Sequence, residues 1–191
     1  MSVIDDAVAI LRRDGLIVYP TETVYGLGCD AFSESAIHKV YEAKGRLLSN
    51  PISIAVSDFE MAYAVSLMDD FQADFVEKFL PGPVTAVVPA SSLVPKMLTA
   101  GTGTIGIRMP DNGTTLKIIG EFDAPITSTS ANVSGGKSPV EFNEVTVTYD
   151  LFVDGGKLPG TPSTVVDLDT MRIVRAGEKV DEIARFLADR G

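Results

Sequence analysis

Three predicted strands near the end of the chain follow one another with no helical segment between them. They are apolar runs at residues 151–153, 163–168 and 172–174, separated by stretches rich in Gly, Pro, Asp and Thr. Parallel neighbours need a long crossover, usually a helix, whereas short connections favour antiparallel pairing. Earlier in the chain, strands and helices alternate. The sequence therefore predicts an α/β (α+β) fold, a single domain over residues 1–191 built on a mixed parallel and antiparallel sheet flanked by helices.

The earlier elements are marked by apolar spacing and by stop residues. Ile4 to Leu11 repeat at helical spacing, and Gly15 is predicted to end this first helix. A buried strand follows at residues 16–19, and residues 20–28 are predicted to be a loop. A second helix is predicted from Ser33 to the stop at Gly45. The remaining predictions are strands at 52–56, 84–88, 105–108 and 125–128, and helices within 58–79, 115–122 and 180–187.

Charge and composition exclude several classes of protein. A net charge of −10 makes a broad nucleic-acid-binding face improbable, so direct binding of any nucleic acid, tRNA included, is expected to be weak or absent. The single cysteine, Cys29, and single histidine, His38, exclude an intramolecular disulfide and a site built from several Cys or His ligands. No apolar run reaches the roughly 20 residues that span a membrane, and no signal peptide is evident at the N-terminus. A cytoplasmic protein is expected.

The segment STSANVSGGKSP, residues 128–139, raises the question of a phosphate-binding P-loop. A true P-loop places its Lys and Ser in the first turn of a helix. Here Pro139 disfavours the helical conformation for Ser138, and Ala131 replaces the first glycine. Short polar side chains and two adjacent glycines still suit a nucleotide, since they let backbone N–H groups approach a phosphate. The segment is therefore predicted to bind nucleotide without being a P-loop.

The chain resembles the YrdC-like family of threonylcarbamoyl-AMP synthases from about Gly15 to Gly177. The resemblance is carried, in chain order, by YPTETVYGLG at 19–28, KGR at 44–46 with NP at 50–51, PGPVT at 81–85, GIRMP at 106–110, SANVSG at 130–135, STVVD at 163–167 and RAG at 175–177. It implies a twisted mixed sheet with a deep, locally positive cavity. It also implies the short form of the family, which lacks an extra C-terminal domain.

The resemblance further implies that L-threonine, bicarbonate and ATP become threonylcarbamoyl-AMP and pyrophosphate. A separate transferase would then modify adenosine 37 of certain tRNAs. The threonine side is expected to involve Thr23, Arg108, Ser128, and Ser163 or Thr164. The nucleotide side is expected to involve Lys44, Arg46, Asn50, Thr104, Ser130, Asn132, Ser138 and Arg175, with Lys44 and Arg46 as the catalytic residues. No role follows for Glu22.

The expected chemistry suits these residues. A carbamate nucleophile is already anionic, so catalysis depends on positive charge that brings it to the α-phosphorus. Up to four cationic side chains and Mg²⁺ would supply that charge, and the planar fork of Arg108 would hold the carboxylate of threonine through both oxygens. Two positions depart from the family pattern: Leu47 stands where many relatives have proline, and Ala55 where many have a histidine facing threonine.

Three other functions stay open at this point. A carbamoyl-adenylating relative would use carbamoyl phosphate, but the domains that accompany it are absent. A non-catalytic RNA-binding module would show salt-sensitive tRNA affinity without turnover. A P-loop hydrolase would depend on Lys137, which a synthase would not.

Overall fold

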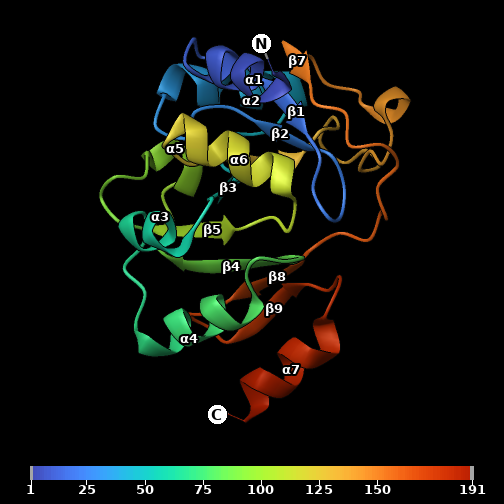
Figure 1. Cartoon of the computed structure of the whole chain (residues 1–191). Helices are drawn as coiled ribbons and strands as arrows, with labels where there is room; N and C mark the ends of the chain where they lie inside the picture. Colours follow the sequence, from blue (N-terminus) through green and yellow to red (C-terminus); the bar gives the residue numbers. More distant parts are fainter. Residues whose placement is uncertain (1, 190–191) are drawn as a thin grey trace.

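Nine strands form one sheet in residues 2–189, the part of the chain that the computed structural model describes (Figure 1). Their order is β7-β1-β2-β6-β3-β5-β4-β8-β9. The strands are β1 (Ile17–Tyr19), β2 (Gly26–Gly28), β3 (Ser53–Ala55), β4 (Val84–Pro89), β5 (Thr104–Arg108), β6 (Ile126–Ser130), β7 (Leu151–Phe152), β8 (Thr164–Asp167) and β9 (Arg172–Arg175). The helices are α1 (Val3–Leu11), α2 (Glu34–Lys44), α3 (Phe59–Ala64), α4 (Asp70–Phe79), α5 (Lys96–Thr99), α6 (Gly113–Phe122) and α7 (Val180–Ala188), with a 3₁₀ turn at Phe142–Glu144.

The sheet is mixed, as the sequence predicts. Strands β1 and β7, β3 and β5, and β4 and β8 pair in parallel. The pairs β1–β2, β2–β6, β3–β6, β4–β5 and β8–β9 are antiparallel. The prediction of a mixed sheet flanked by helices is therefore confirmed.

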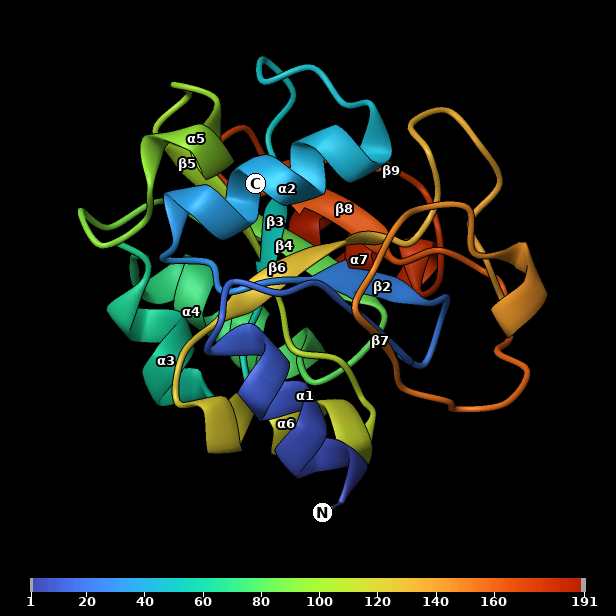
Figure 2. The ribbon, with the colours of Figure 1, turned by 90° about the horizontal axis from the view of Figure 1, so that it is seen from above.

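Alternate residues along the strands enter two separate apolar clusters. The larger cluster lies on one face of the sheet, where paired strand residues such as Ile54, Ala86 and Ile107 point the same way. They pack against the buried faces of α2, α4 and α5, which contribute Val40, Phe75 and Leu98. The smaller cluster lies on the opposite face, where the strand residues Ile17, Ala55 and Ile126 pack against Leu11 of α1 and Ile119 of α6. Figure 2 shows α1 and α6 side by side on one side of the sheet and α2 and α5 on the other.

Local sequence explains the ends of α2, which matter for the site. The Ser33 side chain accepts a hydrogen bond from the Ala36 N–H and caps the first turn. Gly45 ends the helix in the left-handed conformation, with φ of 56°. Both ends agree with the sequence prediction, and they leave Lys44 as the last helical residue.

Two details of the prediction were wrong and one element was missed. The predicted loop 20–28 contains strand β2, which the sequence did not reveal because Gly-Leu-Gly has little strand propensity of its own. Helix α1 ends at Leu11 rather than near Gly15, and Asp14 takes the positive φ of 58° in the turn that follows. The short helix α5 has no side-chain N-cap to reveal it. Within residues 2–189, no helix is both long and apolar enough to cross a bilayer.

Candidate active site

A cavity of about 600 Å³ opens on the sheet face that also carries the smaller apolar cluster. Its floor consists of residues that alternate along the strands with those of the larger cluster: Tyr19, Ser53, Thr85, Gly106 and Ser128. Its walls come from the end of α2, the segment 128–138 and the strands β8 and β9. This volume lies within the usual range for small-molecule sites.

Glycine keeps the floor of the cavity open. A Cβ atom at Gly106 would lie 2.3 Å from Ser53 Oγ, and one at Gly26 would lie 2.6 Å from Tyr19 Cζ. Both distances are shorter than real non-bonded contacts allow. Any side chain at these two positions would therefore displace the residues that form the floor.

Four basic side chains from different parts of the chain line this one cavity. They are Lys44 at the end of α2, Arg46 just beyond it, Arg108 on β5 and Arg175 on β9. Among the described lining residues, Asp167 is the one carboxylate. The chain as a whole carries a charge of −10, so this is a local concentration of positive charge suited to an anionic ligand.

Lys44 joins the end of α2 to the nucleotide-binding segment predicted from the sequence. Its ammonium group donates hydrogen bonds to the carbonyl oxygens of Ser130 and, at 2.7 Å, of Asn132. The backbone N–H of Ser134 in turn donates to the Lys44 carbonyl at 2.9 Å. Burial, and then the nearby charge of Arg46, lower the pKa of Lys44 to about 8. One ammonium N–H remains for a ligand.

Arg46 lies against the loop that follows α2. Its Nε donates to the carbonyl of Asn50 at 3.2 Å and its Nη2 to the carbonyl of Pro51 at 2.8 Å. Asn50 therefore contributes its backbone to holding Arg46. Its side chain is exposed and does not line the cavity.

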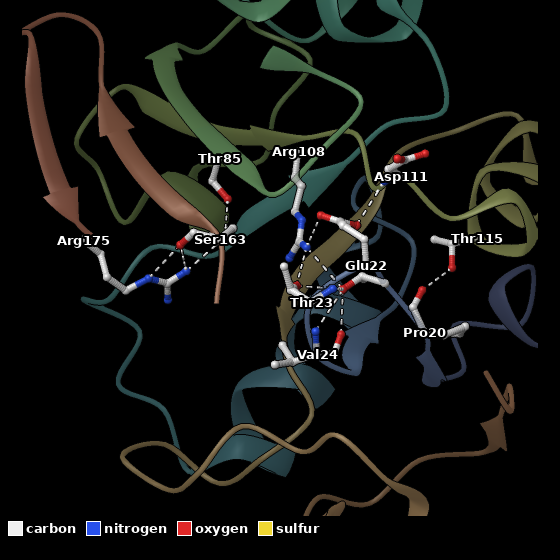
Figure 3. Close-up of polar contacts among 11 residues, drawn as sticks. Pro20, Glu22, Thr23, Val24, Thr85, Arg108, Asp111, Thr115, Ser163 and Arg175 are labelled. Atoms are coloured by element: carbon white, nitrogen blue, oxygen red, sulfur yellow. Dashed lines mark hydrogen bonds and ion pairs between the residues drawn. The ribbon is translucent and has the colours of Figure 1, made fainter. Parts of the chain in front are cut away.

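Arg108 is held at the other side of the cavity by the loop after β1 (Figure 3). Its Nη2 donates to Glu22 Oε1 at 2.7 Å, to Thr23 Oγ1 at 2.5 Å and to Thr21 Oγ1 at 3.2 Å. The second oxygen of Glu22 accepts the backbone N–H of Asp111 at 3.0 Å. Glu22 thus bridges two loops and is the counter-charge of a guanidinium whose side chain is only 9% exposed.

Arg175 and Ser163 form the wall opposite Arg108 (Figure 3). Arg175 donates to the Ser163 carbonyl from Nε at 3.2 Å and from Nη2 at 2.8 Å, and to Ser163 Oγ at 3.0 Å. The Ser163 and Thr85 hydroxyls are also hydrogen-bonded, at 3.1 Å. Burial, and then the charge of Arg108, lower the pKa of Arg175, as expected where like charges share a pocket.

The segment 128–139 lines the cavity but is not a P-loop. No helix begins at Lys137 or Ser138, and Lys137 points to Glu144, with which it forms an ion pair of 2.6 Å. The Asn132 amide instead donates to two carbonyls of its own loop, while its Oδ1 atom is buried without a partner among the described residues. The prediction that this segment lacks P-loop geometry is confirmed.

The structure brings most of the expected site residues together. The cavity is lined by Lys44, Arg46, Thr104, Arg108, Ser128, Ser130, Asn132, Ser138, Ser163 and Arg175. Three expected residues lie just outside it: Thr23 accepts a hydrogen bond from Arg108, the Thr164 hydroxyl donates to the Glu178 carbonyl, and the Asn50 side chain points away. Ala55 is fully buried in the smaller apolar cluster rather than in the cavity lining.

Some lining residues were not identified from the sequence. Tyr19, Ser53 and Thr85 lie on three separate strands, and their common face depends on strand order. The role of Glu22 was missed because its partner Arg108 is 86 positions away. The one local indication that the loop around Glu22 belongs to a site was its position, as a polar segment directly after a buried strand.

The donor set fits a magnesium ion that arrives with phosphates better than a metal held by protein alone. No group of three or more His, Cys, Asp or Glu side chains within residues 2–189 could hold a metal. Asp167, on the cavity wall, uses Oδ1 to accept two backbone N–H groups and has further acceptor capacity. Mg²⁺ commonly binds through one or two carboxylates together with substrate phosphates and water.

Comparison with known proteins gives a consistent result. The family model for Sua5, YciO and YrdC, described as "Telomere recombination", matches residues 9–177. The threonylcarbamoyl-AMP synthases of Pyrococcus abyssi and Bacillus subtilis are 39% and 38% identical to the chain, each over 85% of its length. The match covers 49% of each relative, so the chain spans about half their length.

Solved structures with the same fold include P. abyssi Sua5 in complex with L-threonine and Escherichia coli YciO. The Sua5 structure has a TM-score of 0.87 at 35% identity and covers 94% of this chain and 56% of that one. The YciO structure has a TM-score of 0.84 at 28% identity and covers 92% and 89%, respectively.

Proposed function

The chain belongs to the Sua5/YciO/YrdC family, and from this premise we propose that it is an L-threonylcarbamoyladenylate synthase. It would convert L-threonine, bicarbonate and ATP into threonylcarbamoyl-AMP and pyrophosphate. The observation that carries the proposal is the group of four basic side chains around one cavity in a strongly acidic chain. The structural match to a Sua5 protein complexed with L-threonine supports the choice of amino acid.

The proposed reaction forms two bonds. The amine of threonine attacks the carbon of bicarbonate and, with loss of water, gives a carbamate anion. A carbamate oxygen then attacks the α-phosphorus of ATP, and the bond to the β-phosphate oxygen breaks to release pyrophosphate. Since both reactants are anions, the protein contributes mainly by positioning them and by stabilising negative charge.

The basic residues would divide between the two reactants. Lys44, Arg46 and Arg175 would face the nucleotide, because they lie by the nucleotide-binding segment and β9. Arg108 would face the threonine carboxylate, with Ser128 and Ser163 nearby. Thr23 would act through its hydrogen bond to Arg108.

The polar side chains of the nucleotide-binding segment would complete the nucleotide site. Ser130, Asn132 and Ser138 line the cavity on that side, and Thr104 lines it at the start of β5. The buried Asn132 Oδ1 atom offers an acceptor to an N–H or O–H group of the nucleotide. Asn50 and Thr164 would contribute indirectly, through the Arg46 loop and through the packing beside Ser163.

Magnesium would be held by the phosphates of ATP together with Asp167, and it would neutralise charge on the leaving pyrophosphate. The product would pass to a separate transferase that modifies adenosine 37 of tRNA. These substrates meet in the cytoplasm, where the protein would act.

The decisive test is pyrophosphate release from ATP and Mg²⁺, with and without L-threonine and bicarbonate. The proposal requires release that depends on both additions and that Arg46→Ala abolishes. Arg13→Ala also removes one positive charge, from an exposed residue just after α1, and as the matched control it should leave the rate unchanged. Orthophosphate release independent of threonine would instead support a hydrolase. Dependence on carbamoyl phosphate would support a carbamoyl-adenylating enzyme, and tRNA binding without any release would support an RNA-binding module.

A further inference from the structure

The Arg108 guanidinium is bound on one side only. All of its hydrogen bonds within the described residues are made by Nη2, which has three acceptors for two N–H groups. Nε is buried without a partner, and no hydrogen bond of Nη1 is found. Nη2 therefore has more acceptors than it can satisfy, whereas Nε and Nη1 have none among residues 2–189.

This arrangement conflicts with two-pronged binding of a substrate carboxylate. A guanidinium has two planar forks, Nε with Nη2 and Nη1 with Nη2, and a carboxylate needs one of them to bind through both oxygens. Both forks include Nη2. One N–H of Nη2 lies in each fork, and Glu22 Oε1 at 2.7 Å shares these two N–H groups with the hydroxyls of Thr21 and Thr23, so neither fork of Arg108 is open while all three accept from Nη2.

Glu22 has the same chemical group as the ligand expected at Arg108. It belongs to the chain, so it is always present beside the guanidinium at a high effective concentration. The Glu22 side chain is only 16% exposed, and water screens its pairing with Arg108 weakly. We propose that Glu22 is a built-in competitor for the substrate carboxylate, and that it sets the affinity of the site for the amino acid.

The surrounding contacts allow this exchange without collapse of the loop. If a ligand carboxylate replaced Glu22 in the Nη1–Nη2 fork, it would take one N–H of Nη2, and the other would remain for the hydroxyl of Thr21 or Thr23. Glu22 would keep its hydrogen bond from the Asp111 N–H. The orientation of Arg108 is thus supported redundantly, whereas its neutralisation depends on Glu22. This inference rests on the proposed function, in which Arg108 receives the carboxylate of threonine.

The test is calorimetric binding of L-threonine to the wild-type protein and to Glu22→Gln, without ATP. Glutamine has the same shape and no charge, so it competes less for Arg108. We expect the Kd for L-threonine to fall about tenfold, roughly the weight of one charge-assisted hydrogen bond. Glu22→Asp keeps the carboxylate and should bind within about threefold of wild type, which also shows whether the loop tolerates change. Glu77→Gln alters the net charge equally on a distant helix and should have no effect.

L-threoninamide, which lacks the carboxylate, shows whether Glu22→Gln tightens binding by freeing Arg108 for a carboxylate or tightens the binding of any ligand at this site. Glu22→Gln should not tighten its binding. An unchanged or higher Kd for L-threonine in Glu22→Gln, equal tightening for the amide, or no threonine binding to either protein would each overturn the inference. Because binding needs no turnover, a protein that releases no pyrophosphate but shows the expected pattern would refute the synthase proposal and leave the role of Glu22 standing.

Discussion

Raising the pH from 7 to 9 should weaken ATP binding about tenfold, because Lys44 loses its proton within that range. Burial and the charge of Arg46 lower the pKa of Lys44 to about 8, and only the ammonium form attracts phosphate. With this pKa, roughly nine-tenths of the molecules carry the charge at pH 7 and about one-tenth at pH 9. Bound phosphates keep Lys44 protonated, so the loss of affinity depends on how much of the ligand-free protein has lost this proton. A tenfold loss corresponds to about 1.4 kcal/mol of binding free energy.

The ligand-free protein should respond to pH in the opposite direction. In the unfolded chain the lysine has its usual pKa of 10.5, so above pH 8 the unfolded state binds more protons than the folded state. The free energy of unfolding should then rise with pH, by at most about 1.4 kcal/mol per unit. This rise is best measured between pH 8 and 9. Above about pH 9, the usual pKa of a thiol, Cys29 ionises in the unfolded chain but not in the folded protein, where burial raises its pKa, and this lowers the free energy of unfolding.

Calorimetric titration of ATP at several pH values, beside chemical unfolding of the free protein, measures both effects. Lys44→Met supplies the reference: it should bind ATP more weakly, with a flatter profile that reports only the titration of ATP itself. Lys44→Arg keeps its charge throughout and should also lack the fall. A wild-type profile parallel to that of Lys44→Met between pH 7 and 9 would refute the reasoning.

Three further outcomes follow from single residues. Gly106→Ala should lower the free energy of unfolding by about 1–3 kcal/mol, measured with denaturant, because its methyl group would lie 2.3 Å from Ser53 Oγ; a neutral effect would mean that the floor yields. Lys137→Ala should keep pyrophosphate release within about twofold of wild type, since the side chain is 76% exposed and pairs with Glu144; a large loss would favour the P-loop interpretation. Cys29 should resist thiol reagents at pH 8 until the protein unfolds, since burial raises its pKa to about 12; rapid labelling of the folded protein would contradict that burial.

Features set by short-range interactions could be predicted from the sequence. The cap at Ser33 and the left-handed Gly45 fixed the ends of α2, and hence the place of Lys44, because each depends on neighbours within one turn. Most of the expected site residues do line the cavity, but they were expected from the resemblance rather than by physical reasoning from the chain.

Features set by long-range pairing could not be predicted in this way. The acceptors of Lys44 lie 86 and 88 positions away, and no local pattern indicates that its ammonium group binds backbone carbonyls. Strand β2 has almost no propensity of its own and exists because β1 and β6 pair with it on both sides. The competition between Glu22 and a substrate carboxylate becomes visible only when the loop after β1 is placed against β5.

The position of β6 in the sheet has a consequence for how the chain folds. This strand, late in the sequence, inserts between β2 and β3 and is the link between the two parts of the sheet. Pairings of such long sequence separation close large loops and slow folding. Until β6 is in place, β2 and β3 each expose an unpaired edge that can associate with other chains. Ser128 and Ser130 lie on β6, so the step that joins the two parts of the sheet also brings these two side chains into the cavity.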